Sequence, residues 1–176
     1  MTNPEVLLIQ ETKLKESNLL RVSKTFWKKG QGLAVSAQGA SGGIGTFWDT
    51  SKFDLVLSEC CTHWIFTQLP QKETGHQVSL FNLYVLLLFS EKRDCWDLLR
   101  DFLSSHQLEN IILGGDLNLT LALEEKRGGD LVRDTVREWV EDLILAWDME
   151  DIKPSRGKFT WSNKRLWPGH IVARLD

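Results

Sequence analysis

The chain has 176 residues, of which 42% are hydrophobic and 26% are charged, and its formal net charge is −3. These values are ordinary for a soluble globular protein, so we expect one domain over residues 1–176 with a core of its own. The sequence also excludes a membrane-spanning helix, because the longest apolar run, residues 83–89, is far too short to cross a bilayer.

The charge is unevenly distributed. A basic strip near the C-terminus consists of Lys153, Arg156, Lys158, Lys164, Arg165 and Arg174, with Asp176 as the acidic residue among them. Such a strip suits binding to a phosphate backbone, although a solvated loop explains it equally well. The three cysteines include an adjacent pair and have no metal-binding spacing, and the N-terminus lacks the apolar core of a signal peptide. We therefore expect an intracellular protein, nuclear or cytoplasmic, with reduced thiols.

Hydrophobic periodicity predicts many short strands and two main helices. A helix is expected over residues 91–106 with Ser90 as its N-cap, a second over 131–147, and a weak helical pattern covers 14–30. The expected strands are 5–10, 32–37, 53–58, 62–69, 77–86, 111–113 and 158–162, with a hairpin turn near 73–75 and a further strand beginning at 174. In the glycine-rich segment 41–49, a strand after a tight turn is expected. This order indicates packed sheets with helices outside them.

The segment around Gly114-Gly115-Asp116-Leu117-Asn118 is the main candidate for a functional site. Three apolar residues predict a buried strand, and the two glycines are expected to end it. In an extended segment, Asp116 and Asn118 point to the same side, where an acceptor beside a donor suits proton transfer and charge stabilisation. An ordinary turn explains the same residues, because Gly, Asp and Asn dominate turns.

Two further residues stand at the ends of predicted strands or within them. Glu11 follows the first strand and is a candidate metal ligand, although an exposed glutamate at the start of a loop is more common. Tyr84 is the only tyrosine of the chain, and a tyrosine on a strand is usually a core residue with a satisfied hydroxyl group.

Seven motifs occur in the order found in the endonuclease/exonuclease/phosphatase superfamily, and they resemble most the endonuclease domain of plant LINE-type (non-LTR) retrotransposons. The resemblance implies an α/β, or α+β, DNase I-like fold: a four-layer sandwich of two mainly antiparallel β-sheets flanked by helices. The motifs are residues 8–13 (LIQETK), 41–44 (SGGI) with 47–49 (FWD), 81–84 (FNLY), 114–120 (GGDLNLT), 124–129 (EEKRGG), 158–163 (KFTWSN) and 174–176 (RLD).

The resemblance also implies divalent-metal-dependent hydrolysis of phosphodiesters, with Mg²⁺ or Mn²⁺ as the cofactor and the DNA backbone as the partner. It makes Glu11 the metal ligand, since Mg²⁺ prefers oxygen ligands and retains several waters. Tyr84 contacts the scissile phosphate, Asp116 orients or deprotonates the attacking water, and Asn118 stabilises the charge that develops on the phosphate.

By the same resemblance, Thr160 and Trp161 line the site, and Asp176 orients a catalytic histidine, as the carboxylate of a triad does. The Ser-Asp-His motif with which the family closes and the Trp-Asn strand with which it opens have no counterpart here, and Tyr84 is followed by Val85 rather than Gly-Pro. We therefore expect an incomplete domain that lacks the first and last strands and whose activity is reduced or absent.

Three functions follow from these observations. The first is a DNA endonuclease of retrotransposon origin. The second is a catalytically inactive remnant that binds nucleic acid or a protein. The third is a phosphomonoesterase relative, which ranks lowest because the sequence between Trp161 and Asp176 does not resemble the Trp-Cys-Asp-Arg signature of the inositol-phosphatase branch.

Overall fold

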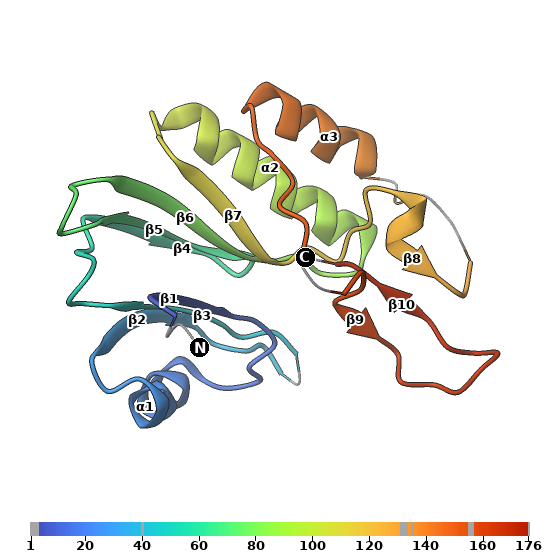
Figure 1. Ribbon diagram of the computed structural model, residues 1–176, viewed down its shortest axis with the longest axis horizontal. Helices are drawn as coiled ribbons and strands as arrows, with labels where there is room; N and C mark the ends of the chain where they lie inside the picture. The colour runs from blue at the N-terminus through green and yellow to red at the C-terminus, as the bar shows by residue number, and fades with distance from the viewer. Residues whose placement is uncertain (1–3, 40, 131–133, 135, 155–156, 176) are drawn as a thin grey trace. The chain divides into compact units, whose positions relative to one another are not determined.

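The computed structural model describes residues 4–39, 41–130, 134, 136–154 and 157–175 (Figure 1). The chain divides into two compact units. The first unit comprises residues 1–84 and 106–116, and the second comprises residues 85–105 and 117–176. The single domain expected over the whole chain stays a prediction.

The first unit begins with a three-stranded antiparallel sheet of strand order β1-β3-β2. Its strands are β1 (Val6–Ile9), β2 (Gly30–Val35) and β3 (Ile44–Asp49). Helix α1 (Glu16–Phe26) covers one face of this sheet, because its apolar residue Leu19 packs against Ala34 and Phe47 (Figure 1). The weak helical pattern of this region is thus confirmed.

The second sheet of this unit has the strand order β4-β5-β6-β7. Its strands are β4 (Leu57–Cys60), β5 (Trp64–Pro70), β6 (Gln77–Tyr84) and β7 (Ile111–Asp116), and only β6 and β7 pair in parallel. In the parallel register Tyr84 is the partner of Asp116. Because parallel strands end at the same edge of a sheet, the last residues of β6 and β7 are neighbours.

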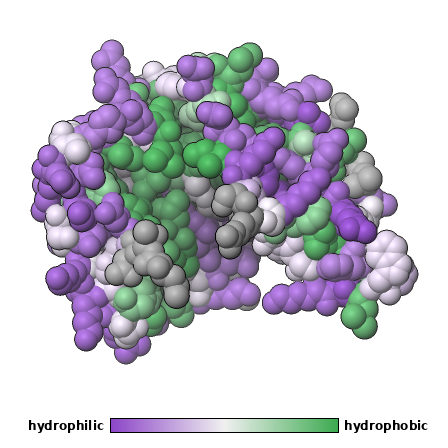
Figure 2. Space-filling view, in the orientation of Figure 1, coloured by the Kyte–Doolittle hydropathy of each residue, from purple (hydrophilic) through white to green (hydrophobic). Residues whose placement is uncertain are grey.

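The two sheets of the first unit pack face to face around an apolar core. Trp48 of β3 packs with Leu69 and Leu80 of β5 and β6, and Val6 and Leu8 of β1 lie against the same cluster. In the space-filling view, hydrophobic side chains gather along the strands of this unit and hydrophilic ones surround them (Figure 2). Helix α1 and the two sheets supply three of the four layers that the resemblance implies.

The second unit contains the remaining helices and a small antiparallel sheet of strand order β8-β10-β9. Its elements are α2 (Phe89–Ser105), the 3₁₀ turn η1 (Leu123–Glu125), β8 (Lys126–Arg127), α3 (Arg137–Ala146), β9 (Trp161–Ser162) and β10 (Val172–Ala173). One face of α2 is buried, because Cys95, Leu99 and Phe102 recur at helical spacing. None of the helices in the described part of the chain is long and apolar enough to cross a membrane.

The glycines of the main candidate segment do not end the strand, contrary to the prediction. Strand β7 continues through Gly114 and Gly115 to Asp116, and both glycines pair with β6. A Cβ atom on Gly115 would lie 2.1 Å from the carbonyl oxygen of Leu83, and the φ angle of Gly115 is +133°. The glycine therefore allows a close approach of two backbones.

Several predicted boundaries were also wrong. Strand β2 begins two residues before the expected 32–37, β4 is displaced from 53–58, and α2 begins at Phe89, so Ser90 lies inside the helix instead of capping it. Helix α3 begins at Arg137 rather than 131, and residues 131–133 and 135 lie outside the described part. No strand begins at 174, because the ladder ends at Ala173 and the amide of Leu175 donates to the Thr160 side chain instead.

Candidate active site

The first unit brings together three of the residues that the sequence singles out. Strands β6 and β7 end side by side at Tyr84 and Asp116, and the loop after β1 carries Glu11. The hydroxyl group of Tyr84 donates a hydrogen bond of 2.8 Å to Oε1 of Glu11. The phenol is therefore bonded directly to one carboxylate, and Asp116, which carries the other, is the register partner of Tyr84 across the parallel strand pair.

The loop that carries Glu11 is fixed by the glycine-rich segment after β2. Glu11 has a left-handed backbone, with φ = 50°, which is uncommon for a residue other than glycine. The next amide, of Thr12, donates to the carbonyl oxygen of Gly43 at 3.0 Å, and a Cβ atom on Gly43 would lie 2.4 Å from the Thr12 hydroxyl oxygen. The glycines therefore support the Glu11 loop, a role that the sequence analysis missed although the paired glycines were its signal.

Asn82 is a buried polar residue beneath this cluster, and sequence reasoning did not assign it a role. Its side chain is fully buried, and its Oδ1 accepts a 2.6 Å hydrogen bond from Nε2 of Gln10. Its Nδ2 donates to the carbonyl oxygen of Gly45 at 2.9 Å and to Oγ1 of Thr46 at 3.2 Å. Asn82 thus joins the two sheets close to the cluster. Its partner Gln10 directly precedes Glu11, and Asn82 itself lies two residues before Tyr84. An asparagine within an otherwise apolar strand was the only signal for it.

The electrostatics of the cluster keep the phenol protonated. Burial raises the pKa of Tyr84 well above its usual range, and the hydrogen bond to Glu11 and the negative charges of Glu11 and Asp116 raise this pKa further. An ionised phenolate beside two carboxylates would be a third negative charge in a site of restricted solvation. Tyr84 is therefore a hydrogen-bond donor throughout the physiological pH range.

Asn118 lies in the second unit, and its backbone differs from the expected one. The strand ends at Asp116, and Asn118 has φ = 46°, so the alternation of an extended chain does not set its direction. Its Nδ2 donates instead to the carbonyl oxygen of Val85 at 2.7 Å. Its own carbonyl oxygen accepts a hydrogen bond of 2.7 Å from Nζ of Lys92, a residue that sequence reasoning also missed.

Thr160 and Trp161 also lie in the second unit. Oγ1 of Thr160 accepts a 3.2 Å hydrogen bond from the amide of Leu175, and the Thr160 amide donates to the carbonyl oxygen of Ala173. Trp161, on β9, is about half exposed. Asp176, for which the resemblance implies an orienting role, lies outside the described residues.

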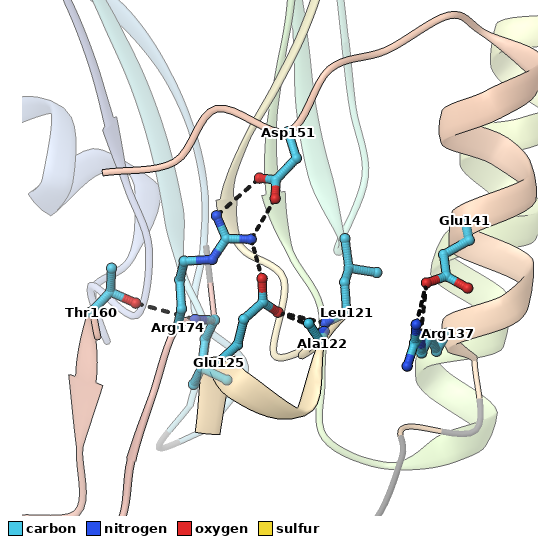
Figure 3. A network of polar contacts seen from close by, with 9 residues as sticks. Leu121, Ala122, Glu125, Arg137, Glu141, Asp151, Thr160 and Arg174 are labelled. Atoms are coloured by element: carbon cyan, nitrogen blue, oxygen red, sulfur yellow. Dashed lines mark hydrogen bonds and ion pairs between the residues drawn. The ribbon is translucent and has the colours of Figure 1, made fainter. Parts of the chain in front are cut away.

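Arg174 differs from the expected basic strip, because it is buried in an ion network (Figure 3). Its guanidinium group donates to both oxygens of Asp151, at 3.0 and 2.6 Å, and to Oε1 of Glu125. The other oxygen of Glu125 accepts from the amides of Leu121 and Ala122. Arg174 therefore organises the loop after Asn118 and is not available to a phosphate backbone; Arg156 of the same strip lies outside the described residues.

The donors of the first unit suit a hard cation. No group of three or more His, Cys, Asp or Glu side chains in the described ranges is arranged to hold a metal ion. The polar side chains of the cluster, Glu11, Tyr84 and Asp116, offer oxygen atoms alone. Mg²⁺ is commonly held by one or two carboxylates together with waters and substrate phosphate, and this donor set fits that requirement.

No protein-family model and no curated protein matches the chain, but solved structures do. It matches the endonuclease domain of TRAS1, a telomere-specific non-LTR retrotransposon, with a TM-score of 0.67 and 11% identity over 98% of this chain and 83% of that one. It matches the 3′ phosphatase NExo from Neisseria bound to a product DNA hairpin (TM-score 0.60, 16% identity, 97% and 76% covered). It also matches D. rerio TDP2 complexed with a single-strand DNA product (TM-score 0.58, 15% identity, 98% and 68% covered).

These similarities, at 11–16% identity, show the fold of the chain. The chain has the DNase I-like fold of the endonuclease/exonuclease/phosphatase superfamily, as the motifs predict, and its structural neighbours include nucleases and phosphatases. The chain spans about half the length of the first solved structures that it matches.

Proposed function

We propose that this chain is a divalent-metal-dependent phosphodiesterase domain that nicks DNA, of the retrotransposon endonuclease lineage. The observation that carries the proposal is the cluster of Glu11, Tyr84 and Asp116, in which Tyr84 donates to Glu11 and lies beside Asp116 at the ends of β6 and β7. A protonated phenol between two carboxylates offers both a donor and acceptors to a phosphate group and its attacking water.

Glu11 would hold the metal ion, Mg²⁺ or Mn²⁺, which would supply Lewis-acid chemistry and neutralise charge on the phosphate. Asp116 orients the attacking water and accepts its proton. When the substrate binds, the Tyr84 hydroxyl group turns from Glu11 and donates a hydrogen bond to a non-bridging phosphate oxygen, and its raised pKa keeps the phenol protonated.

Asn118 donates its amide N–H to the phosphate as negative charge develops there. It follows Asp116 by two residues, so chain connectivity alone keeps the two Cα atoms within about 7 Å of each other. Thr160 and Trp161 contact the substrate beside the scissile bond. DNA is the proposed partner, because two structural neighbours are described in complexes with DNA and several basic residues follow position 153.

The test is nicking of supercoiled plasmid with and without Mg²⁺. We expect nicking by the wild type that chelation abolishes, and a loss of about 10²–10⁴-fold in rate for Glu11→Gln and for Asp116→Asn. Glu73→Gln is the matched control, because Glu73 is an exposed carboxylate in the turn between β5 and β6. Equal background nicking by the wild type and both site variants contradicts the proposal.

Two other functions can be distinguished by further assays on the same purified protein. A 3′ phosphatase is the second candidate, since NExo is described as one. It predicts release of inorganic phosphate from a 3′-phosphorylated oligonucleotide without nicking. Salt-sensitive DNA binding without any turnover identifies a catalytically inactive remnant instead.

A further inference from the structure

Lys92 is a buried lysine on the first turn of α2. Only 6% of the residue is exposed, although lysine is almost never buried without partners. Within the described part of the chain its ammonium group contacts the carbonyl oxygen of Asn118, at 2.7 Å, and the carboxylate of Asp134. Asp134 compensates the buried charge and leaves further N–H bonds of the ammonium for the contact with Asn118.

Asn118 is held from two directions by one continuous segment. Lys92 holds its backbone carbonyl group, and Val85, seven residues earlier, holds its side-chain amide at 2.7 Å. The preceding amide, of Leu117, donates to the carbonyl oxygen of Leu175 at 2.9 Å. A left-handed backbone at a residue other than glycine persists only where its surroundings fix it, and these contacts do so.

We propose that Lys92 is a positioning residue for Asn118. By holding the Asn118 carbonyl group, the ammonium fixes the peptide unit and thereby the direction in which the side-chain amide leaves the backbone. Lys92 is too deeply buried to contact DNA itself. The inference rests on the proposed function, because it assigns Lys92 to the residue that stabilises the phosphate in that proposal.

The kinetic test compares Lys92→Met with Arg93→Met, which removes an exposed cation from the next position of the same helix. We expect Lys92→Met to lower kcat by about 10²-fold with little change in KM, since a small displacement of a catalytic group has an effect of this size. Arg93→Met is expected to leave kcat unchanged. An unchanged kcat in a folded Lys92→Met variant overturns the inference.

A double-mutant cycle separates positioning from a general loss of stability. If Lys92 acts through Asn118, Lys92→Met causes no further loss of kcat in an Asn118→Ala background. A purely structural role predicts that the two losses multiply, and that result overturns the inference. Should Lys92→Met fail to fold, Asp134→Asn takes its place in the cycle, because it keeps Lys92 but weakens the contact that holds the ammonium group in place. Its smaller loss of kcat must likewise vanish in the Asn118→Ala background.

A measurement independent of catalysis distinguishes failure of the inference from failure of the proposed function. The side-chain amide signals of Asn118 in a ¹H–¹⁵N spectrum are identified by their loss in Asn118→Ala. We expect them to shift and to exchange faster with solvent in Lys92→Met, and to remain unchanged in Arg93→Met. Unchanged signals in Lys92→Met overturn the inference whatever the activity. A wild type without nuclease activity whose Asn118 signals still depend on Lys92 refutes the proposed function and retains the positioning contact.

Discussion

The hydroxyl group of Tyr84 donates a 2.8 Å hydrogen bond to Glu11, a residue 73 positions earlier in the chain. This bond connects the end of β6 with the loop after β1, and therefore connects the two sheets of the first unit at the candidate active site. Its geometry depends on the residues that fix each end.

Titration of Tyr84 tests the electrostatics of the site. Tyr84 is the only tyrosine, so tyrosinate absorbance in the near ultraviolet reports on it alone. Burial, Glu11 and Asp116 raise the pKa of Tyr84, so we expect no tyrosinate in the native protein at about pH 10, where the unfolded chain is half ionised. Because the native pKa is the higher one, the associated stability is complete below about pH 10 and is lost as the pH rises through the native value. Native titration near pH 10 would disprove this arrangement.

Asn82 is expected to contribute strongly to stability. Asn82→Ala removes the acceptor of the Gln10 amide and the donor that serves Gly45 and Thr46 near the sheet interface, and each buried polar group left unsatisfied costs about 1–3 kcal/mol. Urea denaturation measures the change. Asn18→Ala is the control, because the Asn18 side chain accepts an exposed hydrogen bond from Arg21, and we expect a change within about 0.5 kcal/mol. Similar effects of the two substitutions would refute this role.

Gly115 is expected to tolerate no side chain. In Gly115→Ala the added carbon meets the backbone of Leu83 at 2.1 Å, which should lower the free energy of unfolding by more than about 3 kcal/mol. Gly75→Ala provides the matched control, since Gly75 also has a positive φ but nothing within 4 Å of the added carbon. Only the conformational cost of about 1–2 kcal/mol applies there. Equal losses in urea denaturation would show that backbone conformation alone, and not the β6–β7 approach, requires Gly115.

Arg174 is expected to stabilise the second unit. Arg174→Met leaves the carboxylate of Glu125, which is largely buried, without its cation, and we expect a loss of about 3–5 kcal/mol. Arg137 and Glu141 form an ion pair on α3, also drawn in Figure 3; the two residues are one helical turn apart and partly exposed. Arg137→Met should therefore cost no more than about 0.5 kcal/mol. Thermal or urea denaturation of both variants gives the comparison, and an Arg174→Met variant as stable as Arg137→Met contradicts it.

The same network predicts a dependence of stability on acid. The hydrogen bonds from Arg174 lower the pKa of Asp151 below its usual value. Because the native pKa is the lower one, the stability from this pair is present above about pH 4 and is lost as the pH falls through the native pKa. In Arg174→Met, this part of the acid dependence should disappear. Parallel curves of unfolding free energy against pH for the wild type and the variant would exclude the linkage.

Much of the local structure was predictable because it follows from hydrophobic periodicity. Strands β1, β3, β5 and β6 and helix α2 lie close to their predicted ranges, since each has an apolar pattern that matches its period. The failures share a cause. The glycines of β7 are ordinarily breakers, and only the pairing with β6 makes them necessary. Likewise, η1, β8 and β10 are too short to carry a pattern of their own.

The sequence by itself determined most of the longer strands and helices, the DNase I-like fold class and the candidates Glu11, Tyr84 and Asp116, because periodicity and ordered motifs are properties of residues near one another in the chain. Tertiary structure decided which distant residues support them. Asn82, Lys92 and Arg174 look like an interruption of a strand, a solvated lysine and part of a basic strip, yet each is buried with specific partners. A buried polar group is stable only where the fold supplies its hydrogen bonds, and those bonds come from segments that local sequence cannot relate.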